Sequence, residues 1–171
     1  MDTIIIDVNI LDDFVEKISA DFIEKISKNT MTFGLISLET NSMHEYKSLG
    51  VTIADDITIQ ELNCVYRGLD EITDVLAFST NYPGEYYGNT QNVLSSTEHF
   101  PNETGYAGEI VLSYPQCERQ SKENNIPIDK ELATLISHGI LHLIGYDHTN
   151  ESEMNIMKKI QSDSIKYLVD G

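Results

Sequence analysis

Residues 138–148, with the sequence HGILHLIGYDH, hold three of the chain's five histidines. His138 and His142 stand four residues apart, so on a helix both side chains lie on one face with Cβ atoms about 5–6 Å apart. A helix that continued to His148 would carry it about 15 Å from His138 along the axis. Because zinc holds nitrogen ligands at about 2.0–2.1 Å, His148 can join the pair only if the chain turns back.

Gly145 stands where such a turn would occur, since the left-handed residue that ends a helix is usually glycine. We therefore expect a helix that carries His138 and His142, a reversal at Gly145, and His148 in the following loop. A histidine pair at this spacing is common by itself. The glycine and the third histidine together are what favour a metal site.

The ligand set of this site indicates which metal it would bind. Three imidazoles without a cysteine suit one Zn²⁺ ion per chain, although nickel and copper also accept imidazole. Three protein ligands leave the fourth position open to water, which is typical of a catalytic zinc site. A metal can lower the pKa of water from 15.7 to about 7, so this site would supply a nucleophile at neutral pH.

The same spacing occurs in the metzincin peptidases, whose motif is H-E-x-x-H-x-x-G-x-x-H. The glutamate of that motif is the general base beside the zinc. Here Gly139 occupies its position, so the metal ligands remain while the group that activates water for attack on an amide is lost. A zinc metallopeptidase-like hydrolase is therefore an alternative rather than the leading interpretation.

The remaining pattern predicts one α+β domain over residues 1–171, a small mixed sheet packed with helices, with the metal site on a helix and the following turn. A chain of this length with 40% hydrophobic residues suits one globular domain. Strands are expected at 3–9, 48–55, 74–79 and 108–113, and helices at 10–28, 58–67, 115–124, from 129 and from 150. Residues 81–106 have the composition of an extended loop, and residues 30–47 fit no clear pattern.

Several residues mark the expected ends of these helices. The pair Thr58 and Glu61 resembles a capping box, as does the pair Asn150 and Glu153. We expect a helix stop at Gly68 and an N-cap at Asp129. The helix over residues 10–28 is inferred from apolar residues at helical spacing, which are Leu11, Val15, Ile18, Phe22 and Ile26.

Charge and cysteine content narrow the class of protein. Eleven Lys and Arg against twenty-eight Asp and Glu give a net charge of −17, which argues against non-specific adhesion to nucleic acid or anionic membranes. The N-terminus lacks the basic region of a signal peptide, and no apolar run approaches the ~20 residues that span a bilayer. We expect a cytoplasmic protein without membrane contact, in which Cys64 and Cys117 are reduced thiols.

Three segments resemble the YbeY family of zinc-dependent bacterial endoribonucleases and rRNA maturation factors. HGILHLIGYDH is similar to the family's signature, ELNCVYRGLDEITDVLAFS to its Leu-Asn…Tyr-Arg-Gly…Thr-Asp-Val-Leu-Ser-Phe segment, and GEIVLS to its Gly-Asp-Ile strand. The similarity covers about residues 48–80 and 107–168. Glu109 replaces the family's aspartate, Ala77 replaces its serine, and the loop over residues 81–106 is longer than usual.

This resemblance implies a metal-dependent endoribonuclease that is specific for single-stranded RNA and matures the 3′ end of small-subunit rRNA. It also implies a role in ribosome quality control and association with the small ribosomal subunit or its assembly factors. His138, His142 and His148 match the family's metal ligands, and Arg67 matches the arginine of its cleft. A non-catalytic, metal-containing ribosome-assembly factor is the other alternative, and a fourth protein ligand on the metal would favour it.

The resemblance makes Arg67 the candidate catalytic residue, and the chemistry of phosphodiester cleavage indicates what it would do. Cleavage builds negative charge on the non-bridging oxygens, and the planar guanidinium group of an arginine suits these oxygens. Its structural alternative is a cation that favours the dipole at the end of a helix.

The neighbours of the histidines have open or structural roles. Asp147 either accepts a hydrogen bond from a histidine or caps the turn, and the sequence favours neither. Tyr146 is expected to pack rather than to catalyse. His44 and His99 lie in polar stretches and are not assigned to the site.

Overall fold

The computed structural model describes residues 4–37, 46–80 and 105–169, with side chains up to residue 166. Its strands are β1 (Ile5–Ile10), β2 (Ser48–Ala54), β3 (Val75–Ser79) and β4 (Tyr106–Ser113). Its helices are α1 (Ala20–Ser37), α2 (Asp56–Arg67), α3 (Tyr114–Glu123), α4 (Ile128–Leu143) and α5 (Glu151–Val169), and a short 3-10 turn spans Asp12–Phe14. The predicted α+β class is confirmed.

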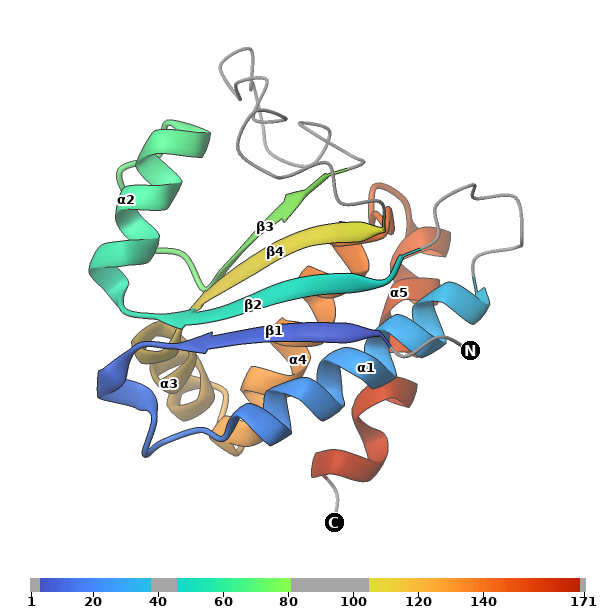
Figure 1. The fold of residues 1–171 in the computed structure, drawn as a ribbon, viewed down its shortest axis with the longest axis horizontal. Coiled ribbons are helices and arrows are strands. Elements are labelled where there is room, and N and C mark those ends of the chain that lie inside the picture. Colours follow the sequence, from blue (N-terminus) through green and yellow to red (C-terminus); the bar gives the residue numbers. More distant parts are fainter. Residues whose placement is uncertain (1–3, 38–45, 81–104, 170–171) are drawn as a thin grey trace.

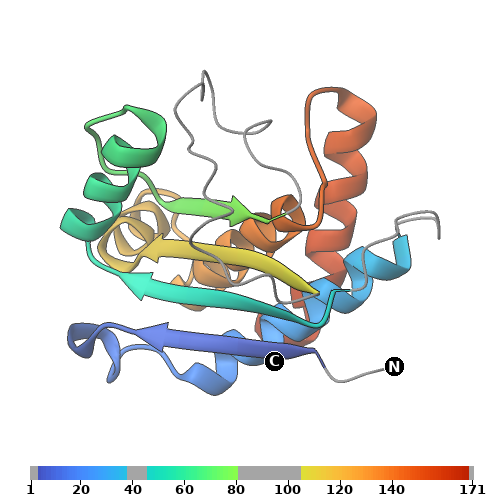
Figure 2. The same ribbon diagram turned by 45° about the horizontal axis from the view of Figure 1, so that its top comes forward.

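The four strands form one mixed sheet in the order β1-β2-β4-β3 (Figure 1). β1, β2 and β4 are parallel, whereas β3 runs antiparallel to β4 and lies at the edge of the sheet. Helices α1 and α4 cover one face, and α5 packs against both of them. β3 lies between α2 and the connection from α4 to α5 (Figure 2).

The core lies between the sheet and the covering helices. Alternate residues of the central strands point to the helices, because side chains alternate across a strand. These strand residues and their helical partners are almost fully buried: Leu49, Val51, Ile53, Ile110, Leu112, Ile23, Ile26, Leu132, Ile136 and Ile140. Apolar burial of this kind contributes roughly 25 cal/mol per Å². One continuous core therefore fixes the position of α4, the helix that carries two of the histidines.

The first helix differs from the prediction for residues 10–28. It begins at Ala20 and continues to Ser37. The hydroxyl of Ser19 accepts a hydrogen bond from the Phe22 amide at 3.2 Å, as a residue that caps a helix does. Leu11 and Val15 lie before this start and are exposed. Residues 30–37 of the ambiguous stretch belong to the same helix, and residues 38–45 lie outside the described part.

Two of the four predicted helix ends were wrong. α2 begins before Thr58, because the Asp55 carboxylate accepts a hydrogen bond from the Thr58 amide at 2.7 Å. α4 begins at Ile128 after Pro127, without a side-chain cap, so Asp129 lies inside its first turn. Proline serves here because its fixed φ suits the entry to a helix.

The other two helix ends agree with the prediction. Gly68 ends α2 in the left-handed conformation with φ +71°. The Asn150 side chain accepts a hydrogen bond from the Glu153 amide at 3.0 Å. The Glu153 carboxylate in turn accepts a hydrogen bond from the Thr149 hydroxyl at 2.6 Å.

Cys64 is exposed and Cys117 is buried, and both are free thiols in the structure. None of the described helices combines the length and apolar character that a membrane span requires.

Candidate metal centre

Helix α4 lies against the edge strand β3, and contacts on either side of His142 fix this arrangement. A Cβ atom built on Gly139 would lie 3.2 Å from Cγ2 of Val75, at the start of β3. At the other end, the Ser79 hydroxyl donates a hydrogen bond to the Leu143 carbonyl at 2.9 Å. The part of α4 that bears the histidines is therefore held along the whole length of β3.

Gly139 occupies the position of the general base in the peptidase motif. It is fully buried on the side of α4 that faces the sheet, where an added Cβ would lie 3.0 Å from Cγ2 of Ile110. That contact is tighter than ordinary packing, so any side chain at this position would require Ile110 and Val75 to shift. The close approach of α4 to the sheet therefore favours glycine where the peptidase motif has its general base.

The predicted chain reversal is present. Gly145 adopts φ +98°, a conformation that L side chains rarely adopt. Its amide donates to the His142 carbonyl at 3.1 Å, and the Tyr146 amide donates to the Leu141 carbonyl at 3.0 Å. These two crossing bonds form the Schellman motif, which satisfies the last carbonyls of a helix while the chain turns.

Tyr146 anchors the turn to α1, a contact that the sequence did not reveal. Its ring is buried, and its hydroxyl donates to the Gly34 carbonyl at 2.7 Å. A Cβ atom on Gly34 would lie 2.6 Å from Cδ1 of Ile144 and 3.1 Å from Cδ2 of Leu141. The lack of a side chain at Gly34 therefore lets the end of α4 and the turn pack closely against α1. The prediction that Tyr146 packs agrees with this contact.

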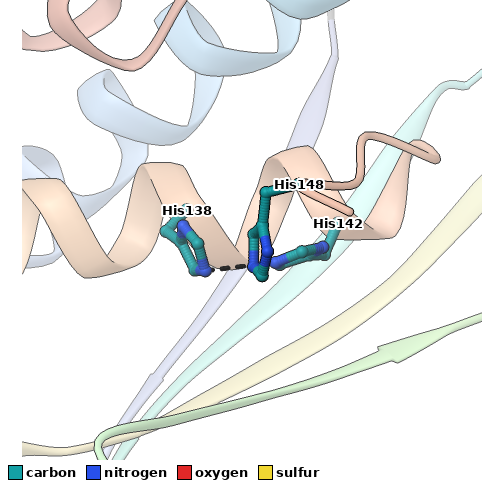
Figure 3. A group of neighbouring side chains, drawn as sticks. All are labelled: His138, His142 and His148. Atoms are coloured by element: carbon teal, nitrogen blue, oxygen red, sulfur yellow. Dashed lines mark hydrogen bonds between the residues drawn. The ribbon is translucent and has the colours of Figure 1, made fainter. Parts of the chain in front are cut away.

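The reversal brings the three imidazoles together (Figure 3). Nε2 of His138 and Nε2 of His142 are 3.1 Å apart. One ring nitrogen of each histidine lies within 4.8 Å of the others. Two nitrogens bound to one tetrahedral zinc at about 2.0–2.1 Å would be about 3.3 Å apart. The cluster therefore has the dimensions needed to hold a metal ion.

A hydrogen bond orients His142 toward the cluster. Its Nδ1 lies 2.9 Å from the Tyr146 carbonyl, and a carbonyl can only accept, so Nδ1 carries the proton of the neutral ring. The lone pair is then on Nε2, the atom that faces His138. Metal-binding histidines characteristically make such a bond through their second nitrogen.

The protonation of the cluster also suits a metal. Burial lowers the pKa of His142 to about 4, and repulsion from His138 and His148 adds to this effect. Burial likewise lowers the pKa of His138, with His148 as the next cause, while Asp74 opposes the shift. Metals bind the neutral imidazole, so both rings are in the binding form at neutral pH.

The described residues contribute three ligands and no fourth. Among their His, Cys, Asp and Glu side chains, the metal-sized group consists of His138, His142 and His148. The Asp147 carboxylate accepts a hydrogen bond from the His148 amide at 2.7 Å. It therefore caps the turn. His44 and His99 lie outside the described residues.

Arg67 occupies the last position of α2 and is half-buried. The structure brings the three histidines together, whereas it places Arg67 on another element. The neighbouring Tyr66 ring contacts Phe78 of β3, with ring centroids 5.1 Å apart. This contact ties the end of α2 to the strand on which α4 also rests.

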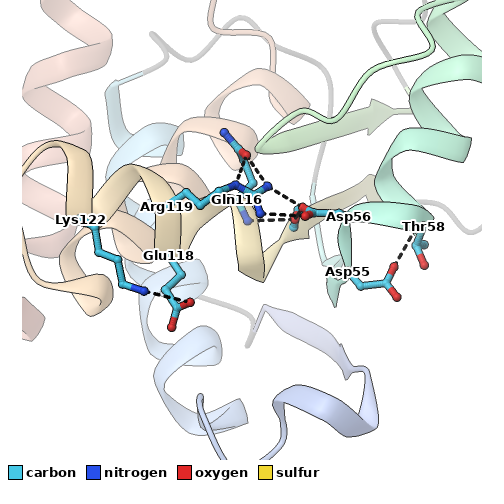
Figure 4. Close-up of polar contacts among 8 residues, drawn as sticks. Asp55, Asp56, Thr58, Gln116, Glu118, Arg119 and Lys122 are labelled. Carbon is cyan, nitrogen blue, oxygen red and sulfur yellow. Dashed lines mark hydrogen bonds and ion pairs between the residues drawn. The ribbon is translucent and has the colours of Figure 1, made fainter.

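The opposite end of α2 is fixed by an ion pair (Figure 4). The guanidinium of Arg119 on α3 donates two hydrogen bonds to the Asp56 carboxylate, at 2.8 and 2.9 Å. The Ser113 hydroxyl donates a third at 2.6 Å. The hydrogen bonds from Arg119 hold the pKa of Asp56 below its usual range. Of the chain's two arginines, Arg119 is therefore engaged in holding α2.

Comparison with known proteins agrees with this architecture. A family model described as endoribonuclease YbeY matches residues 10–169. An endoribonuclease YbeY of Dehalococcoides mccartyi is 37% identical over 158 residues, which cover 91% of each chain. One of Thermoanaerobacter pseudethanolicus is 30% identical over 95% of this chain and 98% of its own. The solution structure of TM1509 from Thermotoga maritima has the same fold, with a TM-score of 0.56 and 21% identity over 95% of this chain and 91% of its own.

Replacing Gly145 with alanine should weaken metal binding. A side chain at this positive φ costs about 1–2 kcal/mol, and relief of the strain moves His148 away from the other rings. We expect a lower zinc affinity, measured by competition with a chromogenic chelator. Gly68→Ala is the matched control, because it introduces similar strain at φ +71° in another helix end. Equal zinc affinity in the two variants would contradict the proposed role of the turn.

Replacing Asp56 with asparagine tests the ion pair that holds α2. We expect a loss of about 1 kcal/mol or less at pH 6, since Arg119 is largely exposed and solvent screens the pair. The folded-state pKa of Asp56 is lowered, so its contribution is complete above the unfolded pKa and is lost as the pH falls through the folded value. Urea unfolding should therefore show a difference that shrinks below about pH 4. Glu61→Gln on the exposed face is the control, and a pH-independent difference would refute the assignment.

Proposed function

Because the chain belongs to the endoribonuclease YbeY family, we propose that it is a zinc-dependent endoribonuclease that cleaves single-stranded RNA. We further propose that it acts in maturing the 3′ end of small-subunit rRNA and in ribosome quality control. The observation that carries this proposal is the convergence of three imidazoles, two on α4 and one in the turn that follows it. Three protein ligands leave a position for a reactant, as in catalytic zinc sites.

The metal would be held by His138, His142 and His148. Zn²⁺ is our choice because all three ligands are nitrogens and the ring spacing suits a tetrahedral ion, with nickel or copper as the alternatives. When bound, the metal supplies Lewis-acid chemistry, polarising a phosphoryl oxygen and acidifying water. The Tyr146 carbonyl keeps the proton of His142 on Nδ1 and so preserves its ligand nitrogen.

Arg67 would bind the phosphate that is cleaved. A guanidinium group donates parallel hydrogen bonds to two phosphate oxygens and stabilises charge that develops on them. Arg67 is assigned this task because it matches the arginine of the family's cleft, whereas Arg119 donates a bidentate pair of hydrogen bonds to the Asp56 carboxylate. The helix that carries Arg67 is fixed at both ends, by Asp56 and by the Tyr66–Phe78 contact.

The two alternative functions lack support from the described residues. A metallopeptidase needs a base where Gly139 packs against Ile110 and Val75. A purely structural metal would favour a fourth protein ligand, and the described metal-sized group contains three histidines.

We also propose where and with what the protein works. Its charge of −17 disfavours long tracts of phosphate contacts, so the small ribosomal subunit or its assembly factors would supply targeting to rRNA. Two free cysteines support a cytoplasmic location, where thiols stay reduced. One core joins the described helices and strands, which supports a single hydrolase domain over residues 1–171.

Arg67→Ala should retain zinc and the melting temperature while cleaving a single-stranded RNA oligonucleotide about 100-fold more slowly, because loss of one well-placed donor has roughly this effect. Zinc content and single-turnover rates would be measured on the same preparation. Lys122→Ala, which removes an exposed cation from α3, is the control. Unchanged cleavage by zinc-loaded Arg67→Ala would remove Arg67 from the mechanism, and casein digestion by the wild type would revive the peptidase alternative.

Salt should weaken RNA binding only slightly. For single strands, the slope of log K against log salt is about −0.7 for each phosphate contacted, so one or two contacts give a slope near −1. Fluorescence anisotropy with labelled RNA between low and moderate salt measures this slope. Arg67→Ala should flatten it by about 0.7. A wild-type slope of roughly −4 or steeper would show an extended phosphate-binding surface and contradict the proposal.

A further inference from the structure

Tyr66 and Phe78 form an aromatic pair that differs from a core pair. Their ring centroids are 5.1 Å apart and their planes meet at 66°. Both residues are partly exposed. By contrast, the stacked rings of Phe14 and Tyr114 are each 5% exposed and belong to the core. The pair on α2 and β3 therefore presents aromatic surface to solvent.

The pair lies between the two parts of the proposed active site. Tyr66 directly precedes Arg67 on α2. Phe78 directly precedes Ser79, whose hydroxyl is bonded to the carbonyl of Leu143, the residue after His142. Because side chains alternate across a strand, the Phe78 ring lies on the face of this edge strand opposite α4, level with the end of that helix. β3 itself runs between α2 and the connection from α4 to α5 (Figure 2). An RNA strand that contacts both the metal ligands and Arg67 would therefore cross the edge of the sheet at β3, where these rings lie.

The charge of the protein indicates how such a strand would be held. Of its eleven lysines and arginines, several are ion-paired with the protein's own carboxylates, among them Lys25, Lys28, Arg119 and Lys122. Affinity for RNA must then come largely from contacts that do not depend on charge. Stacking of bases on aromatic side chains is such a contact, and it tolerates any base because each has a π-face.

We propose that Tyr66 and Phe78 form a stacking platform for one unpaired nucleobase next to the phosphate that is cleaved. The proposal rests on the endoribonuclease function and specifies how that site binds its substrate. In a duplex, neighbouring base pairs cover both faces of each base, so a base must be unstacked before it can reach a protein ring. The platform therefore accounts for single-strand specificity without reading the sequence.

The test combines protein variants with modified RNA. Zinc-loaded wild type, Phe78→Leu and Tyr66→Leu would cleave oligonucleotides that carry one abasic site, moved along the strand. We expect each leucine variant to lower kcat/KM for intact RNA roughly ten- to a hundredfold, the range of one base–aromatic stack. One abasic position should lower the wild-type rate equally, and at that position the leucine variants should lose nothing more. Phe78→Tyr should restore activity, because it keeps the π-face.

The controls separate the platform from folding and from the function itself. Phe22→Leu, a change in another partly buried phenylalanine, should leave cleavage unchanged, and melting curves with zinc content verify each variant. Independent, additive effects of Phe78→Leu and the abasic site would overturn the platform. If the wild type cleaves no RNA, fluorescence anisotropy with the same oligonucleotides measures binding and tests the platform separately from cleavage. Binding that shows the same non-additivity keeps the platform and rejects only the nuclease, whereas binding insensitive to both changes rejects the platform as well.

Discussion

The reversal of the chain at Gly145 is the constraint on which the site depends. Two crossing backbone bonds close the end of α4, and the Tyr146 hydroxyl fastens the turn to the Gly34 carbonyl of α1. The same residue orients His142 through its carbonyl. Tyr146 thus has three roles: its amide helps to end α4, its hydroxyl binds α1, and its carbonyl fixes the protonation of a metal ligand. This coupling makes the position of His148 a property of the tertiary fold rather than of a loose loop.

The sequence predicted the parts of the site that local geometry determines. Helical spacing places His138 beside His142, and the positive φ of the turn requires a glycine at position 145. The sequence did not reveal the role of Gly34, because no residue near it shows that Ile144 packs within 2.6 Å of where a Cβ would be. It also began the first helix too early, since Leu11 has helical spacing without being buried. Those features depend on contacts between distant segments, which a periodic pattern does not contain. Arg67 came only from family resemblance, and no local pattern relates it to the histidines.

The negative charge of the protein has opposite effects on metal binding and on RNA binding. A surface with a net charge of −17 attracts cations, which favours loading of a metal site, yet it repels the phosphates of an RNA substrate. Partial burial lowers the pKa of His138 and of His142, so these two ligands do not add positive charge that would repel a metal cation. The proposed substrate contacts are therefore Arg67 and the aromatic pair of Tyr66 and Phe78. A binding mode based on stacking follows from this shortage of cations.

Packing also explains how a peptidase-like spacing can serve another reaction. In α4 the residue after the first histidine faces the sheet, where Gly139 allows the helix to approach Ile110 and Val75 closely. That approach sets α4 along β3, and the Ser79–Leu143 hydrogen bond completes it. A side chain at this position would require Ile110 and Val75 to shift. The close fit that aligns the histidines with β3 thus favours glycine at the position of the peptidase base.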